Sequence, residues 1–180
     1  MIKLKGIAWD HPRGFDPMVE TASLFQKKNP EVEINWDNRP LQAFADRPIE
    51  EMAFDYDLMV IDHPHVGEAS RKNLIYELNH SKKYENELLL LEKNSVGLSH
   101  QSYNFNGNQY ALAIDAAAPV SAYREDLIDS PPKTFDETIK LAEKSKVIWP
   151  IKPVDSISCF NSIAANFGNP INFVPEKFID

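Results

Sequence analysis

Hydrophobic and polar positions in the first third of the chain alternate between strand-like and helix-like spacing. Residues 2–9 predict a strand, 16–28 a helix and 32–36 a half-buried strand, and the continuous apolar run 57–61 is typical of a strand covered on both faces. Helical stretches are also expected at 41–45 and 49–53. The order β-α-β-α-β predicts parallel strands joined by right-handed crossovers, and therefore the α/β class.

Turn and cap signals divide the rest of the chain. In the first helix, Asp16 is the expected cap and Pro17 the expected first helical residue. Asn106-Gly107 predicts a hairpin turn, and Thr134 with Glu137 predicts the start of a helix. The other expected elements are a helix or turn-rich connection at 68–78, a helix at 84–93, strands at 120–123 and 147–149, and a helix at 156–167 closed by Gly168.

Two similar polar clusters follow two of the apolar runs. The first is Asp10-His11-Pro12-Arg13-Gly14, and the second is Asp62-His63-Pro64-His65-Val66-Gly67. In open α/β folds, ligands bind beyond the carboxyl ends of parallel strands. We therefore expect both clusters to contribute to one cleft, with Pro12 and Pro64 stiffening the turns that present the polar groups.

The side chains expected at this cleft suit a polar ligand. A tryptophan ring can stack on an apolar face, although core packing is an equal alternative, and arginine can donate in a fork or form a structural ion pair. Carboxylates accept bonds from hydroxyl groups. The candidate ligand-binding residues are Trp9, Asp10, His11, Arg13, Trp36, Arg39, Asp62, His63, His65 and Asp115.

The histidines admit a second interpretation. His63 and His65 form a His-x-His pair that zinc hydrolases also use, and Asp62 precedes them. A metal-dependent hydrolase is therefore the alternative function. Because the further histidines of such a pattern are missing from later strands, we favour binding without a metal or other cofactor, and we do not expect an enzyme.

Charge and composition narrow the possible partners. The net charge of −8 argues against nucleic acid, which needs a basic surface. Cys159 is the one cysteine, so no internal disulfide can form, and it is expected to be buried in a helix. No apolar stretch is long enough to span a membrane, and no leader pattern precedes the first strand.

Two groups of motifs resemble the extracellular solute-binding proteins of ABC importers, of the family 1, sugar-binding type. The general group is Ala122-Tyr123-Arg124-Glu125-Asp126-Leu127-Ile128 with Pro131-Pro132-Lys133-Thr134-Phe135-Asp136-Glu137. The narrower group resembles one subgroup and comprises Trp9 to Gly14, Trp36, Arg39, Leu41-Gln42-Ala43-Phe44, and Tyr56 through Gly67.

This resemblance implies a periplasmic-binding-protein-like fold, in which two α/β lobes close on a ligand. Residues 1–115 would form the first ligand-binding lobe, with a mostly parallel sheet flanked by helices, and 116–180 the crossover and a partial second lobe. The segment near Asp115–Pro119 would belong to the hinge. The chain is short for the family, so we expect a truncated member.

The resemblance also sets expectations about partners and location. The ligand would be a small-molecule solute, with a sugar as the expected class, and the partner a membrane permease. An incomplete second lobe would expose apolar surface, which a homodimer could cover. The location would be periplasmic or extracellular, while the missing leader pattern leaves a cytoplasmic one open.

Overall fold

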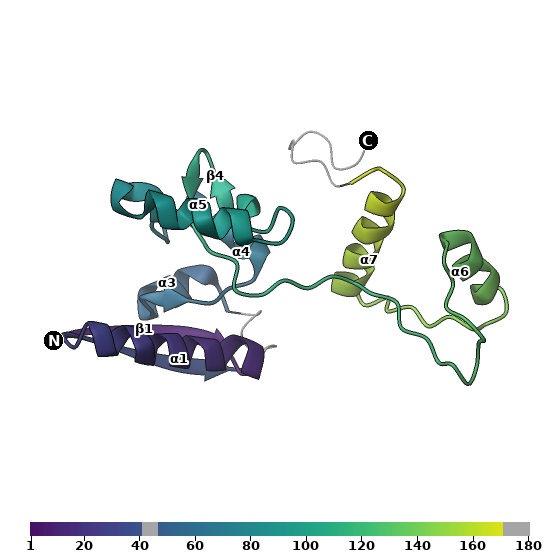
Figure 1. Ribbon diagram of the computed structural model, residues 1–180, viewed down its shortest axis with the longest axis horizontal. Helices are drawn as coiled ribbons and strands as arrows, with labels where there is room; N and C mark the ends of the chain where they lie inside the picture. Colours follow the sequence, from purple (N-terminus) through teal and green to yellow (C-terminus); the bar gives the residue numbers. More distant parts are fainter. Residues whose placement is uncertain (41–46, 171–180) are drawn as a thin grey trace. The chain divides into compact units, whose positions relative to one another are not determined.

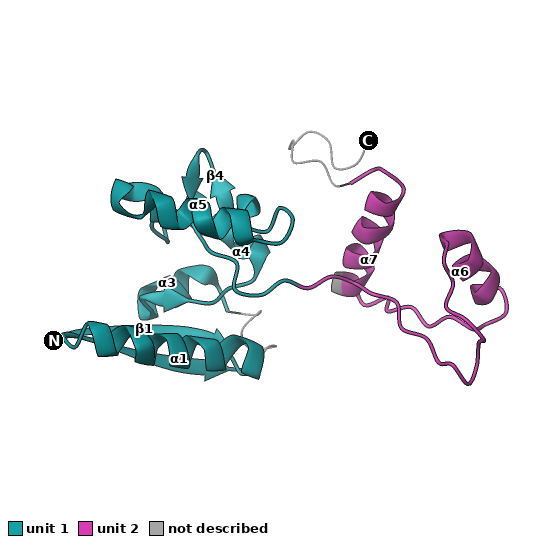
Figure 2. Cartoon of the chain, in the orientation of Figure 1, with its two compact units in different colours: residues 1–116 teal, residues 117–180 magenta. Residues whose placement is uncertain are grey.

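The computed structural model describes residues 1–40 and 47–170, and the helix expected at 41–45 lies outside them. The chain forms two compact units, Met1–Ala116 and Ala117–Asp180 (Figure 2). The candidate residues all belong to the first unit.

The first unit is built on a parallel sheet of three strands in the order β2-β1-β3. Strand β1 (Ile2–Trp9) is central and pairs in full register with β2 (Val32–Arg39) and over two residues with β3 (Leu58–Met59). Helix α1 (Pro12–Lys28) connects β1 to β2 and packs along both (Figure 1). The predicted α/β class is confirmed, and the arrangement is that of part of a periplasmic-binding-protein-like lobe.

Helix α1 begins four residues before the predicted start. His11 caps it, because its Nδ1 accepts a hydrogen bond from the Arg13 backbone N–H at 3.1 Å, and Pro12 takes a first-turn position. The expectation that Asp16 and Pro17 start the helix is therefore wrong. Pro17 lies inside the helix, where it costs one backbone donor. Both prolines suit a helical φ, so the sequence pattern alone could not choose between them.

The main core lies beside β3. Helix α3 (Ile49–Asp55) and helix α4 (His63–Arg71) contribute the buried residues Ile49, Met52 and Ala69. The central strand adds Ile7 and Ala8, which are fully buried. Helix α4 begins at the second polar cluster rather than after it. The histidines of that cluster therefore lie in a helical first turn and not in a loop, because Pro64 is a favourable first-turn residue.

A smaller subdomain follows α4 in the first unit. It contains helix α5 (Glu85–Asn94), the 3-10 turns Leu78–His80, Lys82–Tyr84 and Gln101–Tyr103, and a hairpin of β4 (Asn104–Phe105) and β5 (Asn108–Gln109). The predicted Asn106-Gly107 turn is confirmed, with φ of 55° and 85° at the two residues.

The second unit carries helices α6 (Phe135–Ala142) and α7 (Pro153–Asn166). The predicted cap of α6 is confirmed: Thr134 accepts from the Glu137 N–H at 3.2 Å. The strands expected at 120–123 and 147–149 are not formed, because a strand needs a hydrogen-bonded neighbour and the described part of this unit supplies none. Cys159 is half-buried in α7 rather than fully buried.

Candidate functional site

The first polar cluster lies where β1 and β2 end together. Their parallel register places Trp9 opposite Arg39, and the Asp10 N–H continues the ladder by donating to the Arg39 carbonyl at 2.6 Å. The Asp10 carboxylate accepts from Asn38 Nδ2 at 3.1 Å. Asp10 is thus held at the carboxyl edge of the sheet by its backbone and its side chain, while remaining exposed to solvent.

Trp9 lies over the first turn of α1. A Cβ placed on Gly14 would come within 2.3 Å of the indole Cε3, so the ring rests directly against the glycine backbone. The imidazole of His11 stacks near the indole, with ring centroids 6.2 Å apart and an angle of 20° between the planes. Gly14 is therefore what allows Trp9 to lie flat against the helix.

A long-range ion pair adds Asp115 to the same region. Arg13 Nη2 lies 3.1 Å from Asp115 Oδ2, and the two side chains are 61% and 31% exposed. Because both groups are accessible to water, the pair stabilises the fold only weakly. Its main effect is to hold a charged donor and a carboxylate together beside the end of β1.

The second polar cluster begins α4. Asp62 is the N-cap residue, yet its side chain makes no capping hydrogen bond. The His63 ring lies 5.1 Å from the Tyr103 ring, and burial, followed by the negative charge of Asp62, raises the pKa of Tyr103. His65 is half-buried in the same helical turn. Asp62 therefore keeps its carboxylate oxygens available.

The two clusters share one edge of the sheet. Chain pairing continues beyond β3, since the Val60 N–H donates to the Ile7 carbonyl at 2.9 Å, and so both clusters follow the carboxyl ends of adjacent strands. In the parts of the chain that the structure describes, no hydrogen bond, ion pair or ring contact joins Asp62, His63 or His65 to Asp10 or Arg13. The clusters are neighbours along the edge rather than one bonded network.

Trp36 is placed differently from the other candidates. Trp36 lies three residues before the end of β2. Its ring covers Gly6 of β1, where an added Cβ would lie 2.5 Å from the indole Cε3. The indole Nε1 is sealed from solvent and has no acceptor among the described residues. This geometry favours the core-packing alternative for Trp36.

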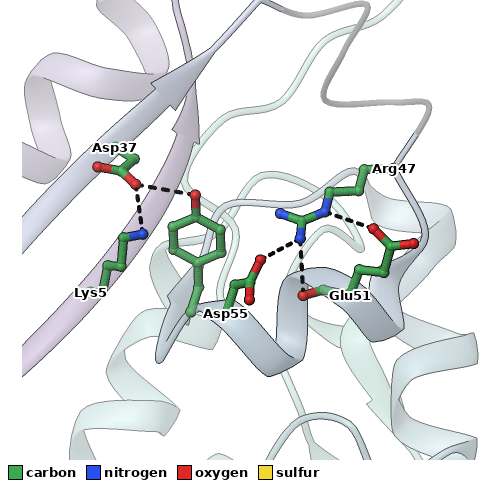
Figure 3. Close-up of polar contacts among 6 residues, drawn as sticks. Lys5, Asp37, Arg47, Glu51 and Asp55 are labelled. Atoms are coloured by element: carbon green, nitrogen blue, oxygen red, sulfur yellow. Dashed lines mark hydrogen bonds and ion pairs between the residues drawn. The ribbon is translucent and has the colours of Figure 1, made fainter.

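Sequence analysis missed a polar cluster on the sheet itself. Lys5 Nζ and the Tyr56 hydroxyl each approach Asp37 Oδ2 at 3.1 Å, and the ammonium lies 4.6 Å from the Tyr56 ring centroid (Figure 3). Hydrogen bonding from Lys5 is the main cause of the lowered pKa of Asp37. Alternation in β1 and β2 puts Lys5 and Asp37 on one face, and this signal could have found them.

A second cluster, on α3, joins Arg47 to two carboxylates. Arg47 Nε lies 3.2 Å from Glu51 Oε2, and its Nη2 is paired with Asp55 (Figure 3). Hydrogen bonding to Asp55 is the largest cause of the raised pKa of the guanidinium. Arg47 lies two residues before α3, and both of its partners lie in the helix, so the cluster ties the preceding chain to α3.

The described residues bear on two questions, whether a metal-binding group is present and whether a helix could span a membrane. Across residues 1–40 and 47–170, no group of three or more His, Cys, Asp or Glu side chains is arranged to hold a metal ion, so the hydrolase alternative lacks a ligand set there. Within the same ranges, no helix is long and apolar enough to cross a membrane.

Comparison with known proteins finds similarity to a saccharide-binding protein. The chain is 23% identical over 157 residues to a maltotriose-binding protein of Pyrococcus abyssi (strain GE5 / Orsay), a match that covers 82% of this chain. The match spans 34% of that protein's length, so this chain corresponds to about a third of the relative. No family model matches the chain.

Proposed function

We propose that this chain is the solute-binding component of an ABC transport system and captures a carbohydrate or similar polar small molecule. The observation that carries the proposal is the fixed Asp10 carboxylate at the joint ends of β1 and β2, with the Arg13–Asp115 pair beside it. Similarity to a maltotriose-binding protein supports a saccharide as the ligand.

Roles for the individual side chains follow from their chemistry. Trp9 provides the apolar face for a sugar ring, and the free Asp62 carboxylate accepts from sugar hydroxyls. Trp36 packs against the sheet. The remaining polar groups donate or accept at the rim of the site, and these are Asp10, His11, Arg13, Arg39, His63, His65 and Asp115.

The proposal also covers how the ligand is enclosed, which protein receives it and where the chain is located. Closure of two lobes around the ligand would use the segment near Asp115–Pro119, which contains the boundary between the two compact units. The partner is a membrane permease and the location is periplasmic or extracellular. No covalent chemistry is involved, so the protein is not an enzyme. A homodimer through the second unit remains part of the proposal.

Titration calorimetry with maltotriose tests the site. Asp10→Ala and Asp62→Ala should each weaken binding about tenfold or more, because each removes a charged hydrogen-bond acceptor. Asp16→Ala is the matched control, since this exposed aspartate lies on α1 outside the proposed site. Unchanged affinity in both variants would show that the site is misplaced. Absence of binding to maltotriose and to other saccharides would contradict the proposed function.

A further inference from the structure

A cavity of about 540 Å³ lies in the small subdomain of the first unit. It is formed by α5, the 3-10 turns around it and the β4–β5 hairpin, and it is lined by none of the strand-end candidates. Pockets for small molecules commonly measure about 300–1,000 Å³. The cavity is therefore large enough for a ligand and separate from the site proposed above.

Gln109 forms a rigid part of the cavity wall. The residue is 5% exposed. Its Nε2 donates to the His100 carbonyl at 2.9 Å and to the Ala111 carbonyl at 2.8 Å. Its backbone N–H donates to Asn79 Oδ1 at 2.9 Å. Both amide hydrogens are thereby used, while Oε1 has no donor among the described residues. Gln109, a residue of the cavity lining, thus carries a fixed and unused acceptor.

His100 provides a second unused polar group. The residue is 6% exposed and lines the cavity, yet its ring makes no hydrogen bond, ion pair or ring contact with any residue that the structure describes. In the described ranges, the side-chain nitrogen and oxygen atoms that are buried from solvent and lack a hydrogen-bond partner belong to Trp36 and Asn161. The unpartnered ring nitrogens of His100 are not among them, so they are accessible. A buried imidazole with accessible nitrogens can both donate and accept a hydrogen bond.

The rest of the lining combines charge with an apolar surface. Lys82 and Glu85 form no ion pair within the described ranges, and Glu92 accepts from Gln101 Nε2 at 3.0 Å. Leu88, from α5, supplies an apolar part of the wall. A ligand here meets acceptors, a donor and a hydrocarbon surface within one cavity.

We propose that this cavity is a second ligand site, for a short saccharide or another uncharged polyol. A hydroxyl group donates and accepts at once, so it can satisfy Gln109 Oε1, the His100 ring and the Glu85 carboxylate in any combination. The carbon face of a sugar ring can lie against Leu88. The site binds its ligand whether or not the strand-end site binds one.

The test follows the His100 ring by nuclear magnetic resonance while maltose is added to the whole chain. The ring signal should move and saturate. Glu85→Ala should raise the dissociation constant about tenfold, because a charged acceptor is lost. Glu87→Ala is the matched control, since both residues are exposed in the first turn of α5 and Glu87 does not line the cavity.

Asp62→Ala separates this proposal from the strand-end site, and it should leave the His100 response unchanged. The proposal is overturned if maltose does not move the His100 signal, if Glu85→Ala and Glu87→Ala weaken binding equally, or if Asp62→Ala abolishes the response. A response to free lysine without one to maltose would overturn the assignment to an uncharged polyol.

Discussion

Gly14→Ala tests the contact that positions Trp9. Gly14 is buried in the first turn of α1, and an added Cβ would lie 2.3, 2.5 and 2.5 Å from three atoms of the indole. Contacts this short require the ring or the helix to move. The substitution therefore has two opposing effects on stability. Alanine is the better helix former, but its methyl group overlaps the indole.

The relative size of these two effects decides whether the free energy of unfolding rises or falls. Alanine in place of glycine stabilises a helix interior by about 1 kcal/mol, whereas overpacking a filled contact costs about 1–3 kcal/mol. Because three ring atoms overlap the new methyl group, we take the upper part of this cost, about 2–3 kcal/mol, and therefore expect a net loss of about 1–2 kcal/mol in the free energy of unfolding. Displacement of the indole should also weaken saccharide binding at the strand ends.

Urea unfolding of four proteins measures the effect: the parent chain, Gly14→Ala, Trp9→Leu and the double variant. The overlap predicts a coupling between the two substitutions, because the smaller leucine leaves room for the methyl group. Gly67→Ala in α4 is the graded control, since its Cβ would meet Phe105 Cε1 at 3.1 Å and should cost less. A more stable Gly14→Ala protein, or an additive double variant, would refute the reasoning.

Three further substitutions test a charged pair, a hairpin turn and a helix cap. The Asp37 pKa is lowered, chiefly by Lys5, so its contribution to stability is present above its ordinary value of 3.8 and is lost as the pH falls through the lower folded-state value. Asp37→Asn should therefore flatten the acid side of the stability curve, measured by urea unfolding between roughly pH 5 and pH 2. Gly107→Ala should destabilise the first unit by about 1 kcal/mol, because alanine disfavours φ of 85°, and thermal unfolding would detect it. Thr134→Ala should cost α6 about 1 kcal/mol and lower the helical signal in circular dichroism; an unchanged signal would contradict the capping role.

Local patterns predicted the elements of the first unit well. Alternation and apolar runs located the three strands, although the run 57–61 forms only the two half-buried residues of β3 and not a strand covered on both faces. The Asn106-Gly107 turn follows from its φ requirement alone. The start of α1 was misplaced because His11 is an unusual cap and because two prolines fit the same helical φ. Such errors concern a choice between neighbouring residues that satisfy one local rule equally.

Contacts between distant residues were harder to predict. The Asp10–Asn38 hydrogen bond follows from parallel register, once β1 and β2 are known to pair. The Arg13–Asp115 pair depends on the path of every segment between them, and no local pattern encodes that path. The strands expected at 120–123 and 147–149 failed for a related reason, since sequence propensity cannot supply a pairing partner.

The lack of buried side chains among the described residues of the second unit has a consequence for cooperativity. Helices of eight and fourteen residues gain little from propensity alone, and the recorded ring contact between them, Phe135 edge-on against Phe167 with centroids 5.6 Å apart, is only partly buried. Amide protons of α6 and α7 should therefore exchange with solvent through local opening, at rates insensitive to mutations such as Gly14→Ala. Amides of the central strand β1 should exchange only when the first unit unfolds as a whole.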